Sequence, residues 1–133
     1  MPHLIVECSE NVARAVALDD LVRALHETAI ATGVFPLGGI RTRVHVSRHY
    51  RIADGDPRHA FVHVQMRIAR GRDLATRKRA GEQVFAALRD GLAALQETHT
   101  IALSLEIEEI NPDTSLRFNT IHEHLQRQTT RGE

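Results

Sequence analysis

Pro2, directly after Met1, is the residue at the start of the chain with the clearest chemical potential. Removal of an initiator methionine before a small residue such as proline leaves a secondary amine at the chain start. The pKa of an α-amino group is about 8 in model peptides, and burial or a nearby arginine lowers it. An amine tuned in this way is a neutral base at about pH 7, as general acid–base catalysis requires. The residue type alone leaves a second interpretation open, in which Pro2 only begins a β-strand.

Arginine is the second residue type that could serve such chemistry. Its planar guanidinium binds a carboxylate through two parallel hydrogen bonds, so several arginines beside one base suit a substrate with several carboxylates. Arg41 and Arg43 alternate along a predicted strand, and Arg72 precedes a predicted helix. On residue types alone, the first two are also explained by a solvated strand face, and Arg72 by a surface position beside a helix start.

Other catalytic and cofactor-binding signatures are missing from the sequence. It contains no GxSxG, no HExxH, no glycine-rich phosphate loop and no CxxC. His122 and His124 are two residues apart on a predicted helix and do not share a face, so we predict no metal site there. The single cysteine, Cys8, lies in an apolar run and is interpreted as a buried core residue. We therefore expect chemistry without metal, nucleotide or flavin.

Length, charge and hydropathy limit the class of protein. The 133 residues fit one domain, and 17 acidic residues balance 17 basic ones, so there is no basic field for nucleic acid or an anionic membrane. We find no signal segment or apolar stretch of membrane-spanning length and expect a cytoplasmic protein. We predict a single domain over residues 1–127 and a disordered tail over residues 128–133.

Hydrophobic periodicity predicts the elements that must position the candidate residues. Alternation indicates strands over residues 4–8, 40–46, 61–68 and 101–108. Three- and four-residue spacing indicates a helix from about residue 18 that ends at Gly33, and a second helix capped by Asp73. Arg77 is expected on the solvated side of that second helix. A short helix over residues 120–126 is expected near the end of the chain.

The order of these elements is strand-helix-strand, a turn over residues 53–57, and strand-helix-strand again. Right-handed crossovers make each unit a parallel pair of strands. We predict an α+β fold in which two such units share a four-stranded mixed sheet, with both helices on one face. A half-polar face without helices to cover it predicts burial against other subunits. This face would carry Ile5, Arg41, Arg43, His45, Phe61, His63, Gln65 and Arg67.

A set of short segments, in order along the chain, resembles the 5-carboxymethyl-2-hydroxymuconate Δ-isomerase family. This family belongs to the tautomerase superfamily, with 4-oxalocrotonate tautomerase and macrophage migration inhibitory factor. The resemblance runs from Pro2 to about Leu125. It is carried by residues 2–9, 31–37, 39–45, 53–55, 60–63, 71–72 and 103–109.

The resemblance implies a homotrimer of β-α-β repeats and an amino-terminal proline as catalytic base. It implies a cofactor-free isomerisation of an unsaturated dienol acid with three carboxylates, in the breakdown of homoprotocatechuate and 4-hydroxyphenylacetate. By position, Pro2 matches the catalytic proline, and Arg41 and Arg72 match the active-site arginines. Arg43 is a weaker candidate for substrate binding.

Two alternatives to this reading of the activity stay open. The chain could be a tautomerase or hydratase that acts on another 2-hydroxydienoic acid. It could also be a non-catalytic trimer of the same fold that binds acidic metabolites or a protein partner.

Overall fold

The four predicted strands form one mixed sheet in the computed structural model, which describes residues 1–131. The order across the sheet is β2-β1-β3-β4. β1 and β2 are parallel, β3 and β4 are parallel, and the antiparallel pair β1 and β3 joins the two units. The predicted sheet is thereby confirmed. The strands are β1 (His3–Ser9), β2 (Arg41–Ser47), β3 (His59–Ala69) and β4 (Thr100–Ile110).

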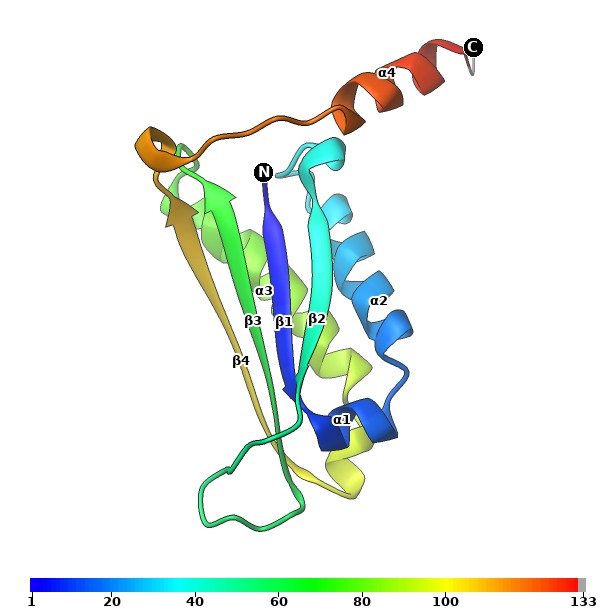
Figure 1. The fold of residues 1–133 in the computed structure, drawn as a ribbon, viewed down its shortest axis with the longest axis vertical. Coiled ribbons are helices and arrows are strands. Elements are labelled where there is room, and N and C mark those ends of the chain that lie inside the picture. The colour runs from blue at the N-terminus through cyan, green and yellow to red at the C-terminus, as the bar shows by residue number, and fades with distance from the viewer. Residues whose placement is uncertain (132–133) are drawn as a thin grey trace.

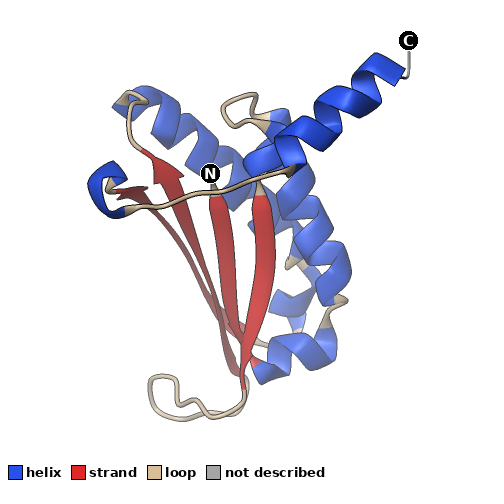
Figure 2. Cartoon of the chain, turned by 45° about the horizontal axis from the view of Figure 1, so that its top comes forward, coloured by secondary structure: helices blue, strands red, loops and turns tan. Residues whose placement is uncertain are grey.

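The two long helices lie side by side on one face of the sheet, as predicted (Figure 1). Figure 2 shows the last helix leaning away from this layer, at the edge of the sheet where the N-terminus lies. The α-helices are α1 (Glu10–Ala15), α2 (Leu18–Ala31), α3 (Leu74–Gly91) and α4 (Ile121–Arg131). Short 3-10 turns are η1 (Leu37–Gly39), η2 (Ala94–Glu97) and η3 (Pro112–Thr114).

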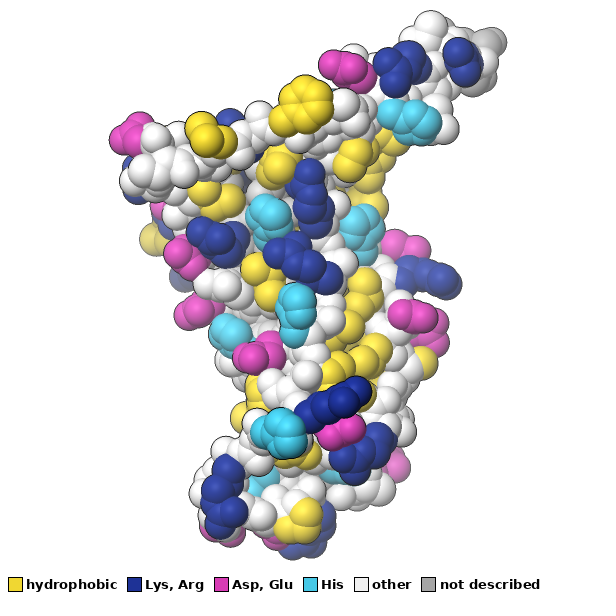
Figure 3. All heavy atoms as spheres, in the orientation of Figure 1, with side chains coloured by type: hydrophobic (Ala, Val, Ile, Leu, Met, Phe, Trp, Pro, Cys, Tyr) yellow, Lys and Arg dark blue, Asp and Glu magenta, His cyan; other side chains and the backbone are white. Residues whose placement is uncertain are grey.

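The core lies between the sheet and these helices. In β3 every second residue is buried, as the alternation in the sequence predicts. Fully or almost fully buried apolar side chains include Leu4, Val6, Cys8, Leu25, Val62, Val64, Met66, Ile68, Val84 and Leu88. The opposite face of the sheet has no helix over it. Figure 3 shows arginine and histidine side chains with scattered apolar ones over this face.

Helix α1 has no counterpart in the sequence prediction, because its six residues are too few to show a helical period. A buried polar pair begins it. The Ser9 hydroxyl donates to Asn11 Oδ1 at 2.6 Å and accepts from the backbone N–H of Phe61 at 3.0 Å. Asn11 Nδ2 donates to the carbonyl of His59 at 2.8 Å. These bonds fasten the end of β1 to the start of β3.

Helix α3 begins where the sequence predicts it. Asp73 Oδ1 accepts from the backbone N–H of Thr76 at 2.8 Å, which confirms the cap. The expectation for Arg77 is wrong. Its Nη1 lies 3.5 Å from Glu109 Oε1, and its side chain is only 28% exposed, because α3 lies close to the last residues of β4.

Helix α4 is longer than the predicted segment of residues 120–126 and continues to Arg131. Residues 128–131, expected in a disordered tail, therefore lie in a helix, and residues 132–133 are outside the described part of the chain. No helix within residues 1–131 has both the length and the apolar character needed to cross a membrane.

Ser9→Ala should destabilise the fold, because it leaves the buried Asn11 Oδ1 and the part-buried Phe61 N–H without their partner. We expect a loss of about 1–3 kcal/mol in the free energy of unfolding, measured by urea denaturation. Ser47→Ala is the matched control: its hydroxyl makes only an exposed 3.4 Å contact with Glu7, so we expect a change within about 0.5 kcal/mol. Equal effects of the two substitutions would contradict the role given to Ser9.

Candidate active site

The strand pairing brings the starts of β1 and β2 and the ends of β3 and β4 to the same end of the sheet. His3 at the start of β1 pairs with Arg41 at the start of β2 and with Arg67 near the end of β3. The end of β4 follows β3 in register, with Ala69 opposite Ile110. The turn before β2, the loop after β3 and the segment after β4 therefore all lie beside the N-terminus (Figure 1). This convergence assembles residues that are far apart in the sequence.

Pro2 is fixed at this end of the sheet. Its side chain is fully buried, and its carbonyl accepts from the backbone N–H of Arg41 at 3.1 Å. Gly39 lies against the proline ring: a Cβ added to Gly39 would be 3.2 Å from Pro2 Cδ. A side chain at position 39 would crowd the ring, so glycine permits this close approach.

Met1 lies between two hydrogen-bond donors. Its sulfur accepts from Arg41 Nη1 at 3.4 Å and from Asn119 Nδ2 at 3.5 Å. The same Arg41 nitrogen donates to the carbonyl of Gly39 at 3.1 Å, which holds the guanidinium beside the chain start. The methionine side chain thus covers polar groups that face the start of the chain.

The amine at the chain start lies in positively charged surroundings. Burial, then the charges of Arg117, Arg72 and Arg41, lower the pKa of the Met1 amine from its ordinary value. This amine belongs to the residue bonded to Pro2. Once Met1 is removed, the nitrogen of Pro2 becomes the amine of the chain. The charges of Arg41 and Arg72 therefore act on the start of the chain, where Pro2 lies.

Arg72 is held rigidly by backbone carbonyls. Its Nε and Nη2 donate to Val34 at 3.3 and 3.2 Å, and its Nη1 donates to Ala69 at 3.1 Å. The guanidinium also lies over the ring of Phe35, 5.1 Å from its centroid, in cation–π geometry. Since a guanidinium has five N–H groups, donors remain for a ligand after these bonds are made.

Arg43 contacts His3, the residue after Pro2. It is two residues further along β2 than Arg41, on the uncovered face, and its Nη1 is bonded to Nδ1 of His3 at 3.1 Å. Burial, followed by the charges of Arg43 and Arg41, lowers the pKa of His3.

Two further residues beside the chain start, Arg117 and Asn119, are not indicated as site residues by the hydrophobic pattern of the sequence. Arg117 and Asn119 lie in the irregular segment between η3 and α4, where no periodicity indicates which way a side chain points. Asn119 does carry one recognisable feature, because its Oδ1 accepts from the backbone N–H of Ile121 at the start of α4, at 2.7 Å.

A small cavity lies at the chain start. Its volume is about 160 Å³, and Met1 and Arg117 both line it. Arg70 and Ser115 add polar groups, and the rest of the lining comes from Ala69, Ile110 and Pro112. The cavity joins the amine to the segment after β4, and removal of Met1 would take away one of its walls.

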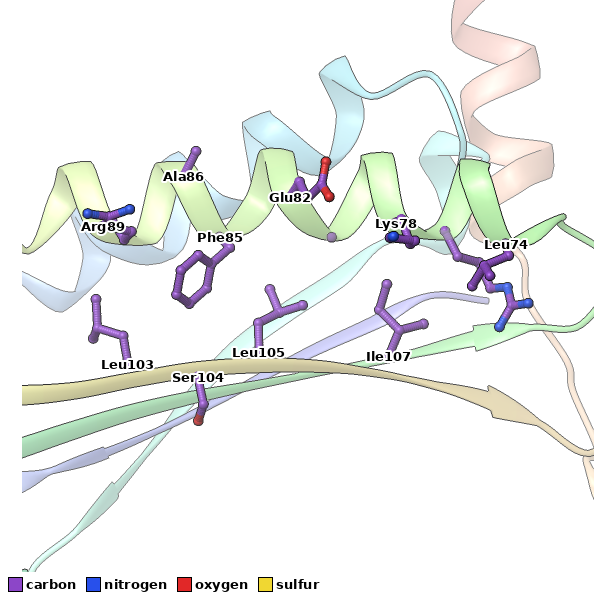
Figure 4. Close-up of a pocket in the computed structure, with 12 residues that line it drawn as sticks. Leu74, Lys78, Glu82, Phe85, Ala86, Arg89, Leu103, Ser104, Leu105 and Ile107 are labelled. Atoms are coloured by element: carbon purple, nitrogen blue, oxygen red, sulfur yellow. The ribbon is translucent and has the colours of Figure 1, made fainter.

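A larger hollow, of about 730 Å³, lies elsewhere, between α3 and β4. Figure 4 shows Leu103, Leu105 and Ile107 pointing from β4 toward α3, while Ser104 points to the other face. Its lining does not include the chain start or any of the arginines around the amine. Within residues 1–131, no three His, Cys, Asp or Glu side chains are grouped to hold a metal ion.

A neutral amine among fixed arginines is suited to proton transfer on an anionic substrate. The arginine charges attract carboxylates and oppose protonation of the amine at the same time. They also stabilise negative charge that builds up on a reacting enolate. The site can therefore bind a polyanion and move a proton within it.

Comparison with known proteins identifies relatives over nearly the whole chain. A family model described as 5-carboxymethyl-2-hydroxymuconate isomerase matches residues 2–125. A 5-carboxymethyl-2-hydroxymuconate Delta-isomerase from Escherichia coli is 43% identical over 92% of this chain and 97% of its own length. A 5-carboxymethyl-2-hydroxymuconate isomerase from Deinococcus radiodurans has a similar structure, with a TM-score of 0.87 at 33% identity, covering 93% of each chain.

More distant structures share the fold alone. A macrophage migration inhibitory factor-like protein from Entamoeba histolytica has a TM-score of 0.58 at 11% identity, covering 88% of this chain and 95% of that chain. This similarity confirms the predicted fold class.

Neutralising one of the arginines should raise the pKa of the amine at the chain start. Arg41→Gln and Arg72→Gln each remove a positive charge that disfavours the protonated form. The pH dependence of N-terminal acylation, followed by mass spectrometry, measures this pKa. Arg23→Gln, on the exposed side of α2, is the matched control and should leave it unchanged. The electrostatic account would be wrong if all three variants titrated alike.

Proposed function

The chain belongs to the 5-carboxymethyl-2-hydroxymuconate isomerase family, and we propose that it performs this isomerisation with the nitrogen of Pro2 as acid–base group. The protein is an isomerase that converts 5-carboxymethyl-2-hydroxymuconate to its unsaturated 2-oxo tautomer. We place the reaction in the breakdown of homoprotocatechuate and 4-hydroxyphenylacetate, in the cytoplasm.

One observation supports the role of Pro2 above the others. The amine at the chain start is partly buried and lies close enough to Arg117, Arg72 and Arg41 for their charges to lower its pKa. A base that must be neutral near physiological pH needs this lowering, since a proline amine is ordinarily protonated there. Pro2 is also rigidly seated, so its nitrogen has a defined direction once Met1 is removed.

The reaction follows as two proton transfers. The neutral Pro2 nitrogen removes the proton from the 2-hydroxyl of the dienol, and the oxygen electron pair becomes the carbonyl π bond. The conjugated double bonds shift, and a carbon further along the chain takes a proton from the protonated Pro2. One group acts as acceptor and then donor, so the proton count balances and no co-reactant is consumed.

Arg41 and Arg72 bind carboxylates and stabilise the developing enolate in this proposal. Three hydrogen bonds to backbone carbonyls and the contact with Phe35 already hold the Arg72 side chain in place. Little side-chain freedom is therefore lost when it binds a carboxylate. Removal of Met1 takes the thioether away from Arg41 Nη1 and frees that donor for a carboxylate. Initiator removal therefore creates the base and uncovers a binding group in one step.

A homotrimer is the proposed functional state, with each site near a subunit boundary. The uncovered sheet face carries half-buried apolar and charged residues, and two large apolar side chains beside the site are almost fully exposed in one chain. These are Leu116 at 98% and Phe118 at 92%. Apolar surface of this kind is typical of a contact with another chain. We propose residues 1–127 as the domain that assembles in this way.

A form that retains an extra residue in front of Pro2 should fold and assemble but be nearly inactive. Joining Met1 or an uncleaved tag converts the Pro2 nitrogen into an amide without a basic lone pair. We expect kcat/KM on the dienol tricarboxylate to fall at least about 100-fold, as for loss of general acid–base catalysis. The processed protein should show kcat/KM rising with pH as one group loses its proton.

The control carries the same tag at the C-terminus, after the mass of each preparation has been checked. It should be as active as the processed protein. Pro2→Ala should keep part of the activity, because a primary amine remains at the chain start. Equal turnover by the Met1-retained and processed forms would exclude Pro2 as the base.

Light scattering at micromolar concentration should give three times the chain mass of 14.9 kDa. Replacing the exposed apolar pair with Leu116→Ser and Phe118→Ser should shift the equilibrium toward monomer, because it removes apolar area from the proposed contact. Ala86→Ser, on the exposed side of α3, should leave the mass unchanged. A fully active monomer would overturn the trimer proposal.

A further inference from the structure

The segment after β4 places a third arginine at the proposed active site. Arg117 lies in the extended stretch between η3 and α4, outside both β-α-β units. Figure 2 shows this stretch passing across the end of the sheet in front of the N-terminus. Arg117 lines the cavity of about 160 Å³ together with Met1, so its side chain and the chain start face one space.

The segment is fastened in this position. Asn119 Nδ2 donates to the carbonyl of Gly38 at 3.0 Å, and its Oδ1 accepts from the N–H of Ile121 at 2.7 Å. One side chain thus ties the segment to η1 and starts α4. Helix α4 itself lies against η1, since a Cβ added to Gly38 would be 2.5 Å from His122 Nδ1. The turn that leads into β2 and Arg41 therefore also anchors the segment that carries Arg117.

Arg117 is exposed, like its neighbours Leu116 and Phe118, but of the three it is the one that lines the cavity. Within residues 1–131, the Arg117 guanidinium has no carboxylate within salt-bridge distance, so its charge is left for a ligand.

The substrate of the proposed reaction has three carboxylates. If Arg41 and Arg72 bind one each, the third still needs a partner. The name of the substrate specifies a muconate, with a carboxylate at each end, and a carboxymethyl branch that adds a third. Arg41 is fixed beside Pro2 by the β1–β2 pairing, and Arg72 is fixed by backbone carbonyls. In the proposed reaction these two bind the end carboxylates of the diacid chain. Arg117 approaches from a separate segment, on the β3–β4 side of the chain start.

We propose that Arg117 binds the carboxylate of the carboxymethyl branch and so sets the specificity for the tricarboxylate. The inference rests on the proposed function and extends it to the substrate. A guanidinium bound through two N–H groups to a carboxylate gives both orientation and charge complementarity. Because Arg117 lies on a segment outside the repeated units, this specificity is built separately from the acid–base machinery at Pro2.

The test compares two substrates that differ in this branch alone: 5-carboxymethyl-2-hydroxymuconate and 2-hydroxymuconate, which has only the two end carboxylates. For Arg117→Gln in the processed protein, we expect kcat/KM on the tricarboxylate to fall roughly 10- to 100-fold, as for loss of a charged hydrogen bond. On the dicarboxylate we expect less than about threefold change, because no branch carboxylate is present to lose its partner. Arg117→Lys keeps the positive charge and should therefore retain part of the preference for the tricarboxylate that Arg117→Gln loses.

Arg127→Gln, on the exposed side of α4, is the matched control and should leave both substrates unaffected. An equal fall on both substrates, or no fall on either, would overturn the assignment of Arg117 while the activity of the unmodified protein leaves the role of Pro2 intact. If the unmodified protein turned over neither substrate, the proposed function would fail and this inference with it. Circular dichroism of each variant shows whether the fold is kept.

Discussion

The antiparallel pairing of β1 with β3 is the constraint on which the site depends. Each β-α-β unit alone would place its strand starts at one end and its crossover on one face. Because β1 and β3 are antiparallel, the strand starts of the first unit lie beside the strand ends of the second unit. Pro2 and Arg41 come from the first unit, Arg72 follows β3 of the second, and the segment after β4 closes the group.

Placing several arginines around one amine stores electrostatic repulsion that the fold must offset. Arg72 shows how this is done, since neutral carbonyls of Val34 and Ala69 and the ring of Phe35 hold its charge without neutralising it. A carboxylate in those places would stabilise the arginine more strongly but would cancel the field at the amine. Binding of an anionic substrate supplies the missing negative charge, so the repulsion in the free protein favours substrate binding.

Much of the fold could be predicted from the sequence, because strands and helices that bury one face leave a period in the residue order. The alternation from Phe61 to Ile68 predicts strand β3, and Asp73 predicts the start of α3; the structure confirms both. Arg77 and α1 could not be read correctly, since their positions depend on the contact with β4 and on buried hydrogen bonds of Ser9 and Asn11. The position of Pro2 after Met1 indicates its chemistry, but a family resemblance is needed to assign Arg41 and Arg72 to the site. Arg117 lies in a segment with no period, so only the folded chain shows where it points.

Arg41 and Arg43 show why position along a strand decides what an arginine can do. Both project from the uncovered face of β2, two residues apart. Arg43 donates to Nδ1 of His3, and since arginine has only donors, this nitrogen must be the unprotonated acceptor. The lowered pKa of His3 keeps its ring neutral down to lower pH, so the bond persists over the range in which a base at Pro2 would work. Arg43 thereby has a partner in the protein, while Arg41, at the sheet edge, exchanges its contact with Met1 for whatever occupies the site once that residue is gone.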